Sequence, residues 1–206
     1  MPSERGYYGS FVAAAKVEAT QRLGRGLETV EILDLLDLQD NDRVLEVGSN
    51  MGYMAGRMQR RAGCEIVGHD TNPSDLVLKT AQKRAKAGQR PDSGEVTFSR
   101  QTVEEANYPD GHFTKFVASH VLEHFEDPTE FLNEAKRITT ENATIVFAVP
   151  QEKYLGQRSP DHKMLFRKIE ELEALLAQHG LEVIDSRVRE EEHSIVVATR
   201  KIKEDK

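Results

Sequence analysis

The 206-residue sequence predicts a doubly wound α/β domain, in which helices cover both faces of a mainly parallel sheet. Strand-like apolar runs alternate with helical patterns through the middle of the chain, and this alternation is typical of parallel sheets. A glycine turn joins the first strand-like run to a helical pattern, and the last two extended runs lie too close in sequence for a parallel crossover. The length suits one domain with a substantial hydrophobic core.

We expect a helical N-terminal cap at residues 1–40, followed by the main domain at residues 41–206. The helical pattern of the cap runs from about Ser10 to Leu38 and divides near Gly24–Gly26, and its second piece is strongly apolar on one side. Five strand-like runs follow, at Arg43–Val47, Glu65–His69, Glu95–Ser99, Lys115–Ser119 and Ala143–Val149. Helical patterns lie between them at Met51–Ala62, Pro73–Lys86 and Asp127–Ile138.

The last part of the chain predicts an antiparallel ending. An amphipathic helix at Phe166–His179 is stopped by Gly180, a residue suited to the end of a helix. Two extended runs, Leu181–Val188 and His193–Arg200, are then joined by only four residues, a link too short for a parallel crossover. An all-parallel dinucleotide dehydrogenase does not have such an ending.

The composition is that of a soluble globular protein, with 38% hydrophobic and 31% charged residues. No apolar stretch approaches the roughly 20 residues of a membrane helix, so we expect no membrane association. Cys64 is the single cysteine, which excludes an intrachain disulfide and weakly favours a cytoplasmic location. The net charge of −7 argues against nucleic acid as a partner, and we interpret the basic residues at 79–90 as a solvated helix face.

Two acids and a glycine turn predict a nucleotide pocket at the carboxyl ends of the first two strands. The first strand ends near Glu46, and the turn that follows carries Gly48 and Gly52. The second strand ends at Asp70. In parallel α/β sheets such glycines let the backbone approach the ligand, and the second acid accepts hydrogen bonds from a ribose.

From about Leu38 to Arg200 the chain resembles the class I S-adenosylmethionine (SAM)-dependent methyltransferases, in particular the group related to the ubiquinone and menaquinone biosynthesis methyltransferases. The resemblance rests on the residues 46–52 and on Gly68–Asp70, Tyr108–Phe113, Ser119–His124, Val149-Pro150 and Asp161–Phe166. It implies a Rossmann-like sheet of seven strands in the order 3-2-1-4-5-7-6, with the last strand antiparallel, and SAM as cofactor. It makes residues 41–206 the SAM-binding methyltransferase domain. Asn50 replaces the middle glycine of the family's first motif, and asparagine enters left-handed backbone conformations at low cost.

The resemblance also implies how SAM is held. Glu46 would lie near the amino group of SAM and Asp70 would accept hydrogen bonds from both ribose hydroxyls. Thr102 and Val103, in place of the family's Asp-Ala pair, would contact the adenine, and Tyr8 either closes over SAM or packs in the core. The full cofactor-binding set implied is Tyr8, Glu46, Gly48, Ser49, Asn50, Gly52, Asp70, Thr71, Thr102, Val103 and Ser119.

Two histidines are predicted as catalytic bases. The methyl group of SAM is already activated by the sulfonium, so an enzyme must align the acceptor and, for a hydroxyl, remove its proton. His120 follows the fourth strand and His162 lies in the loop after the fifth, so both are expected at the same cleft. The sequence therefore predicts O-methylation of a small-molecule or glycan-like acceptor.

A metal-assisted reaction on a ribose or other diol is an alternative. If a helical turn begins at Ser119, then His120, Glu123 and His124 share one face, and His162 can complete a divalent metal site. This set resembles the Glu/Glu/His/His site of small-RNA 2′-O-methyltransferases, with His120 in place of the first glutamate. The same Val-Leu-Glu-His segment also occurs in relatives that use no metal, so the presence of a metal stays open.

Two further classes of function stay open. Asn50, Thr102 and Thr114 depart from the family pattern, which is compatible with a SAM-binding protein that is regulatory rather than catalytic. A nicotinamide-dependent oxidoreductase is disfavoured by the antiparallel ending and by the lack of a Tyr-x-x-x-Lys pair.

Overall fold

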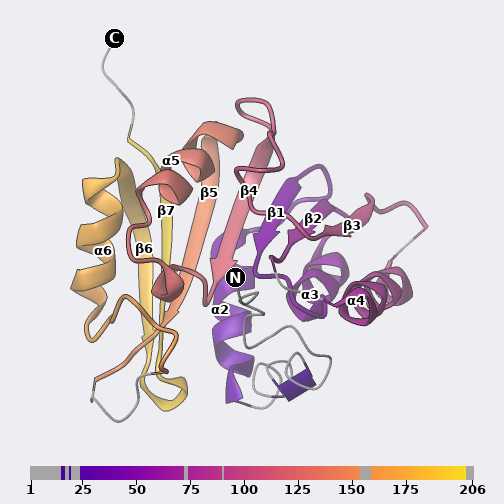
Figure 1. Cartoon of the computed structure of the whole chain (residues 1–206). Coiled ribbons are helices and arrows are strands. Elements are labelled where there is room, and N and C mark those ends of the chain that lie inside the picture. The colour runs from indigo at the N-terminus through magenta and orange to yellow at the C-terminus, as the bar shows by residue number, and fades with distance from the viewer. Residues whose placement is uncertain are drawn as a thin grey trace, which may run out of the picture.

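The computed structural model describes residues 24–71, 74–89, 91–153 and 159–202, together with Ala15, Lys16 and Ala19. These residues form one seven-stranded sheet in the order β3-β2-β1-β4-β5-β7-β6 (Figure 1). The strands are β1 (Arg43–Val47), β2 (Glu65–His69), β3 (Val96–Ser99), β4 (Phe113–Ser119), β5 (Thr139–Pro150), β6 (Leu181–Arg189) and β7 (Ser194–Lys201). Neighbouring strands from β3 to β5 are parallel, and β7 is antiparallel to both β5 and β6, so the predicted order and ending are confirmed.

Helices cover both faces of the sheet, as the doubly wound prediction requires (Figure 1). The helices are α2 (Gly26–Leu36), α3 (Tyr53–Arg61), α4 (Asp75–Gly88), α5 (Thr129–Ile138) and α6 (Ile169–Gln178), with 3-10 turns η1 (Leu122–His124) and η3 (Glu190–Glu192). Consecutive residues of β1 lie on opposite faces of the sheet. Leu45 belongs to the core that α5 and α6 cover, whereas Val44 belongs to the core beneath α2 and α3.

Several element boundaries differ from the predicted ones, and the differences at β5, α4 and α6 have local reasons. Strand β5 begins at Thr139 because α5 runs directly into it, four residues before the predicted start. Helix α4 begins at Asp75 because the Ser74 side chain caps it, accepting from the Val77 N–H. Helix α6 begins at Ile169 because Phe166 forms a parallel bridge with Gln151.

Helix α2 packs on the sheet through Ile32, Leu33 and Leu36, which lie in the same core cluster as strand residues of β1, β4, β5 and β7. The division of the chain at residue 40 stays a prediction. Cys64 is fully buried. Among the described residues, no helix is long and apolar enough to cross a membrane.

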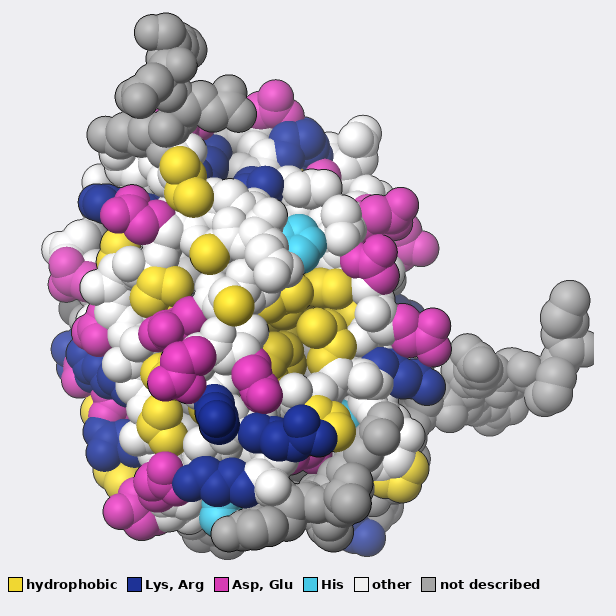
Figure 2. All heavy atoms as spheres, turned by 90° about the vertical axis from the view of Figure 1, so that its left-hand side faces the viewer, with side chains coloured by type: hydrophobic (Ala, Val, Ile, Leu, Met, Phe, Trp, Pro, Cys, Tyr) yellow, Lys and Arg dark blue, Asp and Glu magenta, His cyan; other side chains and the backbone are white. Residues whose placement is uncertain are grey.

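The face of the molecule on the α6 side carries acidic and basic side chains interspersed around a small group of hydrophobic ones (Figure 2). Among the residues described on this face, no continuous basic surface is seen (Figure 2).

Candidate functional site

The turn between β1 and α3 is built from left-handed backbone conformations. Gly48, Asn50 and Gly52 have φ angles of +77°, +43° and +72°. The N–H groups of Gly48 and Ser49 donate to the His69 carbonyl at 2.8 and 3.0 Å, which fixes the turn against the end of β2. Asn50 thus adopts the conformation expected of it in place of a glycine.

Glycine is required at both ends of this turn because neighbouring side chains approach the backbone closely. A Cβ atom on Gly48 would lie 2.9 Å from Val121 Cγ2, and one on Gly52 would lie 3.0 Å from Phe98 Cζ. The segment that follows β4 is thereby brought against the turn. This packing places the ends of β1, β2 and β4 around one region.

Two carboxyl groups lie against the turn. Asp70 Oδ2 accepts a hydrogen bond from the Asn50 N–H at 3.0 Å. Glu46 is buried, and within the described part of the chain its Oε2 has no hydrogen-bond partner. Burial raises the pKa of Glu46 to about 8, against the opposing hydrogen bond from the Ala55 N–H and with a smaller contribution from the charge of Asp70.

His120 lies between two carboxylates. Its Nε2 is 2.9 Å from Oε2 of Glu28 on α2, and its Nδ1 is 3.3 Å from Oε1 of Glu123. Burial alone would lower the pKa of His120, but the Glu28 charge and the hydrogen bonds to both carboxylates outweigh it and the pKa is raised. Burial alone would raise the pKa of Glu28, but the charge of His120 and its hydrogen bond to Glu28 outweigh burial, and the pKa is lowered. With both ring nitrogens facing carboxylate oxygens, His120 is arranged to donate two hydrogen bonds rather than to accept a proton.

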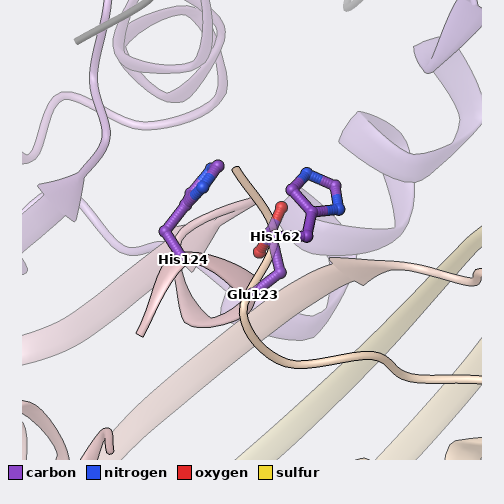
Figure 3. A group of neighbouring side chains, drawn as sticks. All are labelled: Glu123, His124 and His162. Carbon is purple, nitrogen blue, oxygen red and sulfur yellow. The ribbon is translucent and has the colours of Figure 1, made fainter. Parts of the chain in front are cut away.

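A second group of side chains brings Glu123, His124 and His162 together (Figure 3). One potential ligand atom from each of the three lies within 4.8 Å of the others. The predicted arrangement with His120 on the same helical face is wrong. His120 has a left-handed φ of +56° and η1 is a 3-10 turn, so the His120 ring lies between Glu28 and Glu123 and is not one of the three clustered ligand residues.

The loop that carries His162 is docked on Glu123. The N–H groups of Lys163 and Met164 donate to the Glu123 carbonyl at 2.6 and 3.1 Å. The His162 Nδ1 lies 2.9 Å from Oε1 of the buried Glu152, just after β5. Glu152 is therefore a residue of the site that the sequence analysis did not single out.

His124 has an acidic partner as well. Its Nδ1 lies 3.4 Å from both the carbonyl and the Oδ2 of Asp161. Each histidine of the Glu123–His124–His162 group is thus held by a further polar group from the loop after β5.

Residues 20–186 match a family model described as a methyltransferase domain. The chain belongs to the class I SAM-dependent methyltransferase family. Ajmaline N-methyltransferase from Rauvolfia serpentina is 28% identical over 130 residues, which cover 61% of this chain and 43% of that enzyme. This methyltransferase domain therefore spans less than half the length of that curated relative.

Solved structures share the fold of this methyltransferase domain at low sequence identity. A SAM-dependent methyltransferase from Aquifex aeolicus matches with a TM-score of 0.69 at 16% identity, covering 92% of this chain and 98% of that one. Geranyl diphosphate C-methyltransferase from Streptomyces coelicolor, in complex with Mg²⁺, geranyl diphosphate and S-adenosyl-L-homocysteine, matches with a TM-score of 0.70 at 13% identity, covering 98% and 88%.

The other residues implied for SAM binding have varied surroundings, and their contact with SAM stays a prediction. Ser49 is buried and Thr71 is exposed, whereas Tyr8 lies outside the described residues. The Thr102 Oγ1 accepts from the Glu105 N–H while the Thr102 N–H donates to the Glu105 carboxylate, so this pair closes a turn. The Val103 side chain is in the core, and Ser119 Oγ lies 3.4 Å from Glu28 Oε1.

The Glu123–His124–His162 group fits a divalent cation in its donor types. Imidazole nitrogens with a carboxylate oxygen are ligands for zinc and other first-row transition metals. Within the described residues, Glu123 Oε2 is buried and has no hydrogen-bond partner. The polar groups behind the two histidines are of the kind that orient imidazole ligands of metals.

Proposed function

We propose that this protein transfers the methyl group of SAM to a hydroxyl oxygen of a small-molecule or glycan-like acceptor, with His162 as general base. The pairing of His162 Nδ1 with the buried Glu152 at 2.9 Å carries the proposal. A carboxylate that accepts from one ring N–H selects the tautomer whose other nitrogen can take a proton, and it stabilises the imidazolium that forms. His120, the other predicted base, has a carboxylate oxygen at each of its two ring nitrogens.

In this reaction the chain aligns the acceptor oxygen with the carbon–sulfur bond of SAM, and His162 takes the hydroxyl proton. A general base of this kind contributes typically about 10²–10⁴-fold to the rate. Ajmaline N-methyltransferase and geranyl diphosphate C-methyltransferase methylate nitrogen and carbon, so the choice of oxygen here rests on the His162–Glu152 pair.

Metal-assisted methylation of a ribose or other vicinal diol is a second candidate, favoured by the Glu123–His124–His162 group and by Glu123 Oε2, which has no hydrogen-bond partner among the described residues. A divalent cation held by these three residues would polarise an acceptor hydroxyl as a Lewis acid. His162 would then be a ligand rather than the base.

The experiment is a methyl-transfer assay with labelled SAM on catechols, nucleosides, sugars and amines, each with EDTA and with added Mg²⁺ or Mn²⁺. We expect turnover on a hydroxyl acceptor that falls about 10²–10⁴-fold in the variant His162→Gln while SAM affinity is kept. Turnover that survives EDTA supports the histidine base, whereas loss with EDTA and recovery with Mn²⁺ supports the metal.

Two results would contradict the proposal. A preference for the amine acceptors, with unchanged turnover in His162→Gln, would remove the role of His162. Tight SAM binding without turnover on any acceptor would favour a non-catalytic SAM-binding protein.

A further inference from the structure

Glu28 belongs to α2, far in sequence from the strand-end loops, yet its side chain reaches the end of β4. We infer that Glu28 is a positioning residue of the acceptor site: it acts through His120 to hold the Glu123 carboxylate toward His124 and His162. A complete acceptor site then requires that α2 packs on the sheet. This rests on the second candidate of the proposed function, the metal-assisted reaction, in which Glu123 takes part in the acceptor site.

The contacts form a buried chain of carboxylate, imidazole and carboxylate. Glu28 Oε2 and Oε1 lie 2.9 and 3.2 Å from His120 Nε2, and Glu123 Oε1 lies 3.3 Å from His120 Nδ1. The exposed fractions of the side chains are 3% for Glu28, 11% for His120 and 1% for Glu123. Water cannot readily replace any of these partners, so loss of one leaves the next group buried without its hydrogen bond.

Hydrogen bonds fix the backbone around Glu123, whereas the Glu123 side chain is held by the contacts that run from Glu28 through His120. The His120 N–H donates to the Ala148 carbonyl at 2.8 Å, and its left-handed φ turns the chain out of β4. The Glu123 carbonyl is bound to the loop of His162 through Lys163 and Met164. His120 supplies the hydrogen bond on Oε1, while Oε2 has no partner among the described residues.

The position of Glu28 is set by contacts that do not touch the acceptor site. The Glu192 carboxylate accepts from the N–H groups of Leu27 and Glu28 at 2.9 and 2.6 Å, at the start of α2. Glu31, three residues after Glu28 and also buried, forms ion pairs with Arg187 and Arg189 of β6. Glu31 is therefore a matched control: it lies on the same helix, is equally buried and is ion-paired, but has no contact with His120.

The test compares Glu28→Gln with Glu31→Gln in the full chain, in the presence of S-adenosyl-L-homocysteine. We measure Mn²⁺ binding by electron paramagnetic resonance, the imidazole ¹⁵N signals of His120, His124 and His162 by NMR, and thermal melting. In Glu28→Gln we expect Mn²⁺ binding to weaken by about tenfold, the lower end of what indirect partners of metal ligands show, and the signals of all three histidines to move. In Glu31→Gln we expect comparable loss of melting temperature with both other readouts unchanged.

The outcomes distinguish a positioning role of Glu28 from a role only in docking α2, and they separate both from the metal candidate of the proposed function. If the wild type binds no Mn²⁺, the metal candidate of the proposed function fails, and the NMR comparison alone decides the role of Glu28. Movement of the His124 and His162 signals in Glu28→Gln but not in Glu31→Gln supports the inference. Unchanged His124 and His162 signals in Glu28→Gln, or equal changes in both variants, would overturn it and leave Glu28 as a residue that only docks α2.

Discussion

At the ends of β1 and β2 the site is shaped by the backbone, whereas at the ends of β4 and β5 it is shaped by side chains. The predicted donor half, residues 46–52 with Asp70, owes its form to three positive φ angles and two close backbone approaches. The proposed acceptor half, residues 120–124 with Glu152 and His162, depends on side chains from separate segments and on Glu28 of α2. Backbone conformation is a local property of the residue types, but a side-chain cluster exists only when distant segments pack together.

The largest effect is expected from Asp70→Ala, which breaks the donor half alone. We expect SAM affinity to fall by roughly 100-fold or more, since each hydrogen bond to a charged acceptor contributes about 1.5–3 kcal/mol. Calorimetric titration with SAM checks this. The control is Asp75→Ala, whose exposed side chain pairs with Arg100 on the surface. Mn²⁺ binding should stay unchanged in Asp70→Ala, and a parallel loss would show that the two halves are not separate.

An intermediate effect is expected on the pH dependence of SAM binding. The pKa of Glu46, raised by burial to about 8, keeps its carboxyl protonated at neutral pH. A cationic amino group beside it favours the ionised form, so SAM binding should release a proton and strengthen as the pH rises toward about 8. Titrations in buffers of different ionisation enthalpy measure this release. Glu46→Gln should abolish it, and a proton count of zero in the wild type would refute the assignment.

The same carboxyl makes a prediction about stability. Its pKa in the folded protein lies above the ordinary value of 4.5, so folding favours the protonated form. The Glu46 carboxyl contributes on the order of a few kcal/mol to the free energy of unfolding. This contribution is fully present below about pH 4.5 and is lost as the pH rises through about 8. Urea unfolding should show Glu46→Gln gaining stability relative to wild type at about pH 9. Equal differences at acidic and alkaline pH would contradict this.

The smallest effect is expected at Asn50, the departure from the family motif. Asn50→Gly should change the free energy of unfolding by less than about 1 kcal/mol, because easier left-handed geometry offsets the greater entropy of the unfolded chain. Asn50→Ala should lose about 1–2 kcal/mol, because alanine pays the left-handed penalty without a compensating side chain. Urea unfolding of both variants measures this. Equal stability of the two would mean that the turn does not require a left-handed residue.

Glu28 and Glu152 each occupy a sequence position that indicates a buried functional contact. Glu28 stands four residues before Ile32 and so lies on the apolar face of its helix, where a charged residue needs a buried partner. Glu152 follows closely on a buried strand end, the place where functional side chains gather in α/β sheets. The sequence does not show which residue either carboxylate contacts, because the contacts Glu28–His120 and Glu152–His162 depend on how α2 and the loop after β5 pack.

The sequence by itself determined the strand order through its family resemblance, the antiparallel ending through a four-residue link, and the left-handed turn through Gly48, Asn50 and Gly52. These follow from chain connectivity and from the backbone conformations that each residue type permits. Only the tertiary structure decided that His120 faces Glu28 and that Glu123, His124 and His162 form a separate group. That choice depends on one left-handed residue after β4 and on the docking of α2, and both are stabilised by contacts between segments far apart in the chain.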